Sequence, residues 1–157
     1  MTLQLELIRH ADALPKVPGG SDHDRALSPL GERQVLIMGE RLRERANYPD
    51  RVWCSTARRT RQTLAALGYD FTSIASYQER LYETELEVLL EFIAEVRGLA
   101  GRMMIVGHNP GLQDLLTWLV GPDVPEMRTA TYVRVQVPDR PARPLRGKSR
   151  LLESWSP

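Results

Sequence analysis

The sequence predicts a three-layer α/β/α protein, in which helices cover both faces of a mainly parallel central sheet and a C-terminal β hairpin ends the chain. Short apolar runs at residues 3–8, 51–54 and 103–106 are typical of buried strands. Helical patterns separate these runs, and this alternation indicates βαβ units with parallel strands. The run 132–137 alternates apolar and polar residues, which predicts the β-structure of the terminal hairpin.

The N-terminal third contains a strand, a loop and a helix. Gln4 and Glu6 interrupt the first strand, although a buried parallel strand is normally continuously apolar. Residues 11–27 are rich in Pro, Gly, Ser and Asp and predict a loop. Ser28 followed by Pro29 is a typical helix start. The apolar positions of this helix are expected on one face: Val35, Met38, Leu42 and Ala46.

The later elements follow from apolar periodicity, capping residues and glycine stops. Either Ser55 or Thr56 is expected to cap a helix that Gly68 ends. The expected elements are a strand at 51–54, a helix at 57–67, a strand at 72–77, a helix at 84–97, a strand at 103–106, a helix at 111–120 and β-structure at 132–137.

Length and composition predict a single domain over residues 1–157, without repeats. A net charge of +1 gives no electrostatic indication of a nucleic-acid partner. No apolar run approaches the roughly 20 residues of a membrane helix, and no signal peptide is visible, so we expect a cytoplasmic protein without a membrane partner. The single cysteine, Cys54, fits a reducing compartment and is interpreted as a structural thiol. The basic, proline-rich segment 138–150 is interpreted as a solvated loop.

Three segments place cationic or imidazole side chains directly after a strand. They are Arg9-His10, residues 55–63 and residues 107–110. Parallel strands would bring the three turns to one edge of the sheet, where α/β folds bind their ligands. The helix after Thr56 would also offer free N–H groups to an anion. Imidazole nucleophiles beside guanidinium groups suit phosphoryl transfer.

Four ordered segments then resemble the histidine phosphatase superfamily, which has the phosphoglycerate mutase-like fold: residues 7–13, 25–34, 54–63 and 106–111. The small size and alternating tail resemble its SixA-type bacterial phosphohistidine phosphatases. The resemblance implies that His10 is the nucleophile and that Arg9, Arg59 and His108 stabilise the phosphoryl oxygens. It selects Arg59 over its neighbouring arginines, and it places Arg25 at the edge of the site.

The sequence departs from the family pattern in two ways. Ala11 replaces the usual glycine after the nucleophile, and the catalytic glutamate of mutase-type members has no certain counterpart. Glu79 and Glu83 lie where such an acid is expected and remain alternatives, as does the absence of one. A weak general acid would favour a phosphohistidine substrate, because a phosphoramidate leaving group needs less protonation than an alkoxide.

The predicted enzyme is therefore a phosphohistidine phosphatase that forms a phosphohistidine on His10, acts on a phosphorylated protein and releases inorganic phosphate. The alternatives are a small-molecule phosphomonoesterase or mutase of the same superfamily, and a non-catalytic phosphate-binding scaffold. We expect no cofactor and no metal, since the spacing of the three histidines matches no metal-binding signature. His23 is interpreted as a surface residue. The phosphorylated substrate and the oligomeric state stay open.

Overall fold

A six-stranded mixed sheet organises the protein in the computed structural model, which describes residues 2–45 and 47–157. Its spatial order is β3-β2-β4-β1-β5-β6. The first four strands in this order are parallel, while β5 is antiparallel to β1 and β6 is antiparallel to β5. The strands are β1 (Leu3–Arg9), β2 (Arg51–Ser55), β3 (Ala75–Gln78), β4 (Arg102–Gly107), β5 (Tyr132–Val137) and β6 (Arg150–Trp155).

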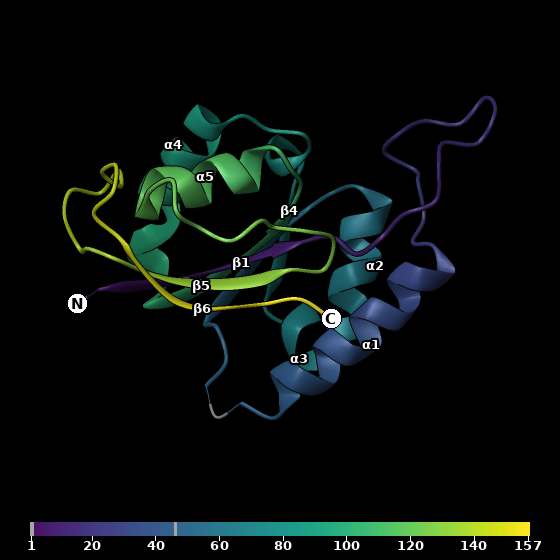
Figure 1. Ribbon diagram of the computed structural model, residues 1–157, viewed down its shortest axis with the longest axis horizontal. Coiled ribbons are helices and arrows are strands. Elements are labelled where there is room, and N and C mark those ends of the chain that lie inside the picture. The colour runs from purple at the N-terminus through teal and green to yellow at the C-terminus, as the bar shows by residue number, and fades with distance from the viewer. Residues whose placement is uncertain (1, 46) are drawn as a thin grey trace.

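Helices cover both faces of this sheet, which confirms the predicted three-layer α/β/α class (Figure 1). One face packs against α1 (Pro29–Arg43), α2 (Arg58–Leu67) and α3 (Tyr69–Thr72), and the other against α4 (Leu86–Val96) and α5 (Gly111–Val120). Short 3₁₀ turns at Glu79–Leu81 and Arg97–Leu99 flank α4. No helix in the described ranges is long and apolar enough to cross a membrane.

The C-terminal hairpin belongs to the main sheet, since β5 hydrogen-bonds to β1 along its whole length. The basic segment that connects β5 to β6 packs onto the protein: Arg97 donates hydrogen bonds to the backbone oxygens of Pro138 and Pro141 at 2.6 and 3.0 Å. Arg143 pairs with Glu87 at 2.6 Å. The predicted solvated loop is therefore tied down at several points.

Three local predictions need correction. The strand expected at 72–77 begins only at Ala75, because residues 69–72 form α3. The first long helix ends at Arg43, and Ala46 lies outside the described residues. Neither Ser55 nor Thr56 caps α2: its N-cap is Ala57, which makes no side-chain capping bond. The two expected capping hydroxyls contact other side chains instead, as described below.

The carboxyl ends of β1, β2 and β4 meet at one edge of the sheet, as predicted. Arg9 pairs with Gly107 in the β1–β4 register, and the backbone N–H of His10 donates to the Gly107 oxygen at 3.1 Å. Strand β2 lies on the other side of β4 and ends at Ser55. The three turns predicted to carry chemistry therefore converge.

Candidate active site

His10 directly follows β1 and its side chain is buried. Its Nδ1 lies 2.7 Å from the backbone oxygen of Ala11. A carbonyl oxygen only accepts hydrogen bonds, so Nδ1 carries the proton and Nε2 keeps its lone pair. The structure thus presents Nε2 as the nucleophilic atom of a neutral imidazole.

Arg59 lies in the first turn of α2 and contacts that nitrogen. Its Nε donates to Nε2 of His10 at 3.3 Å, and the side chain is only 3% exposed. The helix holds it in place, because the hydroxyl of Thr63 donates to the Arg59 oxygen and accepts from the Ala11 N–H. Helix α2 and the turn after β1 are thereby fixed to each other at the site.

His108, at the end of β4, is the second imidazole, and its ring centroid lies 5.2 Å from that of His10. Its Nε2 lies 2.7 Å from the hydroxyl oxygen of Ser55. That oxygen already accepts a hydrogen bond from the Ala57 N–H at 3.3 Å, which leaves the hydroxyl proton free for donation to His108. The Nδ1 atom of His108 is buried and has no hydrogen-bond partner among the described residues.

Burial keeps both imidazoles neutral. It lowers the pKa of His10 to about 4, and the guanidinium groups of Arg59 and Arg9 act in the same direction, against the Ala11 hydrogen bond. Burial likewise lowers the pKa of His108 to about 3, with further lowering by His10 and Arg59. A neutral imidazole at pH 7 is the form that a nucleophilic role requires.

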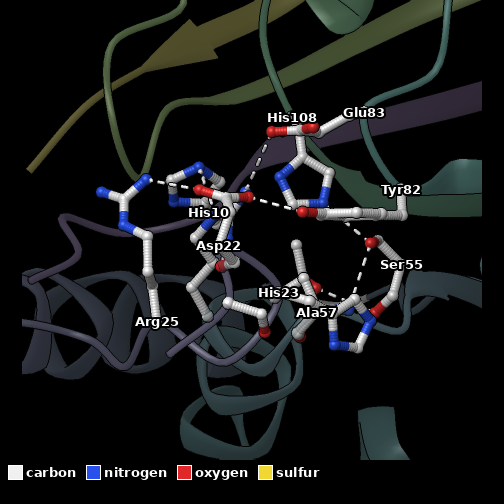
Figure 2. Close-up of polar contacts among 12 residues, drawn as sticks. His10, Asp22, His23, Arg25, Ser55, Ala57, Tyr82, Glu83 and His108 are labelled. Atoms are coloured by element: carbon white, nitrogen blue, oxygen red, sulfur yellow. Dashed lines mark hydrogen bonds and ion pairs between the residues drawn. The ribbon is translucent and has the colours of Figure 1, made fainter. Parts of the chain in front are cut away.

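Asp22 is the central residue that sequence reasoning missed. It comes from the 11–27 loop, and its backbone oxygen and carboxylate accept hydrogen bonds from Arg59 at 2.8 and 3.1 Å. Its carboxylate also accepts from the Tyr82 hydroxyl at 2.6 Å and from Arg25 at 3.1 Å. Figure 2 shows these contacts as dashed lines around Asp22. The Tyr82 hydrogen bond, with Arg25 and Arg59, holds the pKa of Asp22 well below its usual range.

The remaining predicted residues differ in their partners. Arg9 donates to the Met127 oxygen at 3.1 Å, while its buried Nε has no partner among the described residues. Arg25 reaches the site through Asp22. Glu83 lies 3.9 Å from Arg59 and is largely exposed. Glu79 instead accepts from the Thr56 hydroxyl at 2.6 Å.

His23, interpreted from the sequence as a surface residue, is half-buried and contacts other side chains. Its ring packs edge-on against Tyr82, with centroids 4.9 Å apart, and its Nε2 lies 3.0 Å from the Thr56 hydroxyl. Its backbone oxygen accepts the Arg58 N–H at 2.9 Å. The start of α2 is therefore less free for an anion than predicted, since a loop carbonyl already occupies one of its N–H groups.

Two further predictions concern Cys54 and metal binding. Burial raises the pKa of the Cys54 thiol to about 12, which favours a structural role over a nucleophilic one. No group of three or more His, Cys, Asp or Glu side chains in residues 2–45 and 47–157 could hold a metal ion.

Comparison with known proteins agrees with the motifs. The sequence profile of the histidine phosphatase superfamily (branch 1) matches residues 5–96. The chain belongs to this superfamily. An uncharacterized protein of Mycobacterium tuberculosis is 42% identical over 104 residues, which cover 66% of this chain and 63% of that relative. The match thus spans less than two thirds of the relative's length.

Solved structures of superfamily members are similar over the whole chain. The structure of a proposed phosphohistidine phosphatase SixA from Agrobacterium tumefaciens has a TM-score of 0.83 and 26% identity, with all of both chains covered. A second proposed SixA, from Nakamurella multipartitia, has a TM-score of 0.80 and 29% identity, covering 100% of this chain and 97% of that one. This member of the histidine phosphatase superfamily is therefore SixA-like in sequence and in fold.

Proposed function

We propose that this protein is a phosphatase that forms a covalent phosphohistidine on His10 and that its substrate is a phosphohistidine on another protein. The geometry of His10 carries the proposal. Its Nε2 is unprotonated because Nδ1 donates to Ala11, and it lies 3.3 Å from Arg59. Phosphoryl transfer requires a nucleophile and a fixed guanidinium that can reach the same phosphoryl group.

In the first step, the lone pair of His10 Nε2 attacks phosphorus as the bond to the leaving nitrogen breaks. That bonding pair returns to the substrate imidazole. The phosphoryl oxygens are then stabilised by Arg59, by Arg9 and by the Nδ1–H of His108, which has no other partner among the described residues. Donation of the Ser55 proton to Nε2 of His108 leaves its ring proton on Nδ1, where a phosphoryl oxygen accepts it.

In the second step, a water oxygen attacks the phosphorus on His10. The P–N bond breaks, its electron pair returns to Nε2, and the water proton leaves with solvent or with the product. Inorganic phosphate is released and neutral His10 is regenerated. The low pKa of His10, about 4, favours its departure without a proton on Nε2.

The charges near the site support a leaving group that needs little acid assistance. Asp22 is held as an anion by Tyr82, Arg25 and Arg59, and burial together with Asp22 raises the pKa of Tyr82 to about 12. Neither group is a good proton donor at neutral pH. The histidine of a phosphohistidine can leave as a neutral imidazole when its other ring nitrogen carries a proton. An alkoxide leaving group, by contrast, needs a proton during bond cleavage.

The surroundings of the site favour a macromolecular substrate. The 11–27 loop supplies Asp22 and is too short to form a folded cap. A groove of about 590 Å³ lies beside the site, and both Glu83 and Asn109 line it. A protein surface can contact such a groove, while a small phosphosugar has fewer groups with which to do so.

The test compares kcat/KM on phosphohistidine peptides and proteins with that on para-nitrophenyl phosphate, sugar phosphates and phosphoserine peptides. We expect the highest value for phosphohistidine, and His10→Ala should abolish turnover while the protein stays folded. Efficient hydrolysis of one small phosphoester alone would favour a phosphomonoesterase or mutase. Phosphate binding without turnover of any substrate would favour the scaffold. An acid-labile phosphoryl label on any residue other than His10 would contradict the mechanism.

A further inference from the structure

A second cluster of arginines surrounds a cavity near the carboxyl end of α1, away from the catalytic edge of the sheet. The cavity has a volume of about 180 Å³, and Arg41, Arg45, Arg102 and Arg134 all line it. Glu6, at the base of this cluster, lies four residues before His10, a separation of roughly 13 Å along a strand. The cluster is therefore distinct from the catalytic site.

Buried Glu6 explains only part of this positive charge. Its carboxylate is fully buried and accepts hydrogen bonds from Arg45 at 2.9 Å and Arg102 at 2.5 Å. The polar residue that interrupts the apolar pattern of the first strand is thus neutralised from two sides. Burial of one carboxylate requires a cationic partner, and this site provides two.

Glu153 accounts for one more arginine. Its carboxylate pairs with Arg134 at 3.2 Å and accepts a hydrogen bond from the Trp155 indole at 3.1 Å. Four guanidinium groups therefore face two carboxylates, which leaves two positive charges without a carboxylate of their own. The buried Nε atoms of Arg45 and Arg134 also have no acceptor among the described residues.

Arg41 is the arginine most available to a ligand. It is exposed near the end of α1, and its guanidinium lies 4.3 Å from the centre of the Trp155 ring. No hydrogen bond or ion pair joins its side chain to another described residue. Figure 1 shows the end of β6 close to α1, where this contact forms.

Size and ring stacking limit what this cavity can bind. Tyr132 stacks on Trp155 with centroids 4.9 Å apart, and Arg41 covers the same indole, so little ring face remains for a nucleobase. A volume of 180 Å³ corresponds to about six waters at roughly 30 Å³ each, which is below the usual size of a drug-like ligand pocket. Guanidinium groups match the oxygens of phosphate geometrically.

We infer that this cavity is a second anion site, which binds a phosphate-sized dianion through Arg41 and the neighbouring arginines. The ligand is either free orthophosphate or the phosphate group of a small phosphomonoester. Both present the same oxygens to the arginines, and a phosphomonoester extends its organic part toward the open side of the cavity.

The test follows the indole N–H resonance of Trp155 by NMR, assigned with Trp155→Phe, in His10→Ala protein to prevent turnover. Orthophosphate and O-phosphoserine are titrated separately at constant ionic strength. We expect a saturable shift, and the tighter-binding ligand identifies the source. Arg41→Gln should weaken the binding about tenfold, equivalent to about 1.4 kcal/mol. Arg33→Gln, which removes an exposed charge from the same helix, is the matched control and should leave it unchanged.

Three results would overturn the second site. The first is a Trp155 shift that does not saturate or that chloride reproduces at the same concentration. The second is equal binding in the Arg41→Gln and Arg33→Gln proteins. The third is loss of the Trp155 shift when Arg59→Ala is added to the His10→Ala protein, because the shift would then report binding at the catalytic site. None of these results bears on the proposed phosphatase activity.

Discussion

The buried neutral state of His10 predicts how stability depends on pH. An unfolded histidine takes up a proton below its ordinary pKa of 6.5, while folded His10 stays neutral to about pH 4. Between these values the unfolded chain binds more protons, so the free energy of unfolding falls as the pH falls. A pKa difference from 6.5 to about 4 corresponds to about 3 kcal/mol, at about 1.36 kcal/mol per pH unit.

The measurement compares urea unfolding of the natural sequence and His10→Gln between pH 7 and pH 4. Glutamine does not titrate, so the loss of stability over this range should be smaller in the variant by about 3 kcal/mol. His108→Gln should act in the same direction, since the pKa of His108 is about 3. Carboxylates that titrate in this range are present in every protein compared and cancel. An identical pH dependence in the natural sequence and His10→Gln would refute the neutral, buried nucleophile.

Three further predictions concern the catalytic site. Ser55→Ala should lower kcat by about tenfold to a hundredfold with little change in KM, because His108 loses the hydroxyl that fixes its proton. The control Ser76→Ala, on β3, should match the natural enzyme in steady-state assays. Asp22→Asn should tighten competitive inhibition by phosphate, since a carboxylate no longer competes for Arg59; weaker inhibition would show that Asp22 chiefly positions Arg59. Turnover should survive EDTA and be inhibited competitively by tungstate, because guanidinium groups supply the positive charge; recovery only with a divalent ion would contradict this.

The parts of the site that could be predicted from the sequence are those determined locally. A strand that ends at Arg9 or Gly107 and is followed directly by a histidine places that histidine at a sheet edge whatever the rest of the chain does. Parallel pairing then brings the ends of those strands together at one edge of the sheet. The helix after Ser55 positions Arg59 in the same way, so Arg59 and His108 both lie beside His10.

The missed residues depend on contacts between distant segments. Asp22 belongs to a polar loop like many solvated loops, and nothing nearby indicates that its carboxylate turns back onto Arg59, 37 residues further along the chain. Tyr82 lies between the two glutamates considered as acids, yet its hydroxyl matters only because Asp22 is there. The predicted cap of α2 was wrong for the same reason, because the Ser55 hydroxyl contacts His108 instead of capping the helix.

Asp22 also bears on how a substrate would enter. A buried guanidinium is strongly destabilised without an anionic partner, and Arg59 is only 3% exposed. In the described structure Asp22 supplies that partner, and its carboxylate also accepts hydrogen bonds from Tyr82 and Arg25. In the proposed reaction a phosphoryl group takes over this role, and the Arg59 contact with His10 gives way as phosphorus approaches Nε2. Exchange of one anion for another keeps Arg59 paired throughout, so substrate binding would need a small movement of the 11–27 loop rather than the opening of a lid.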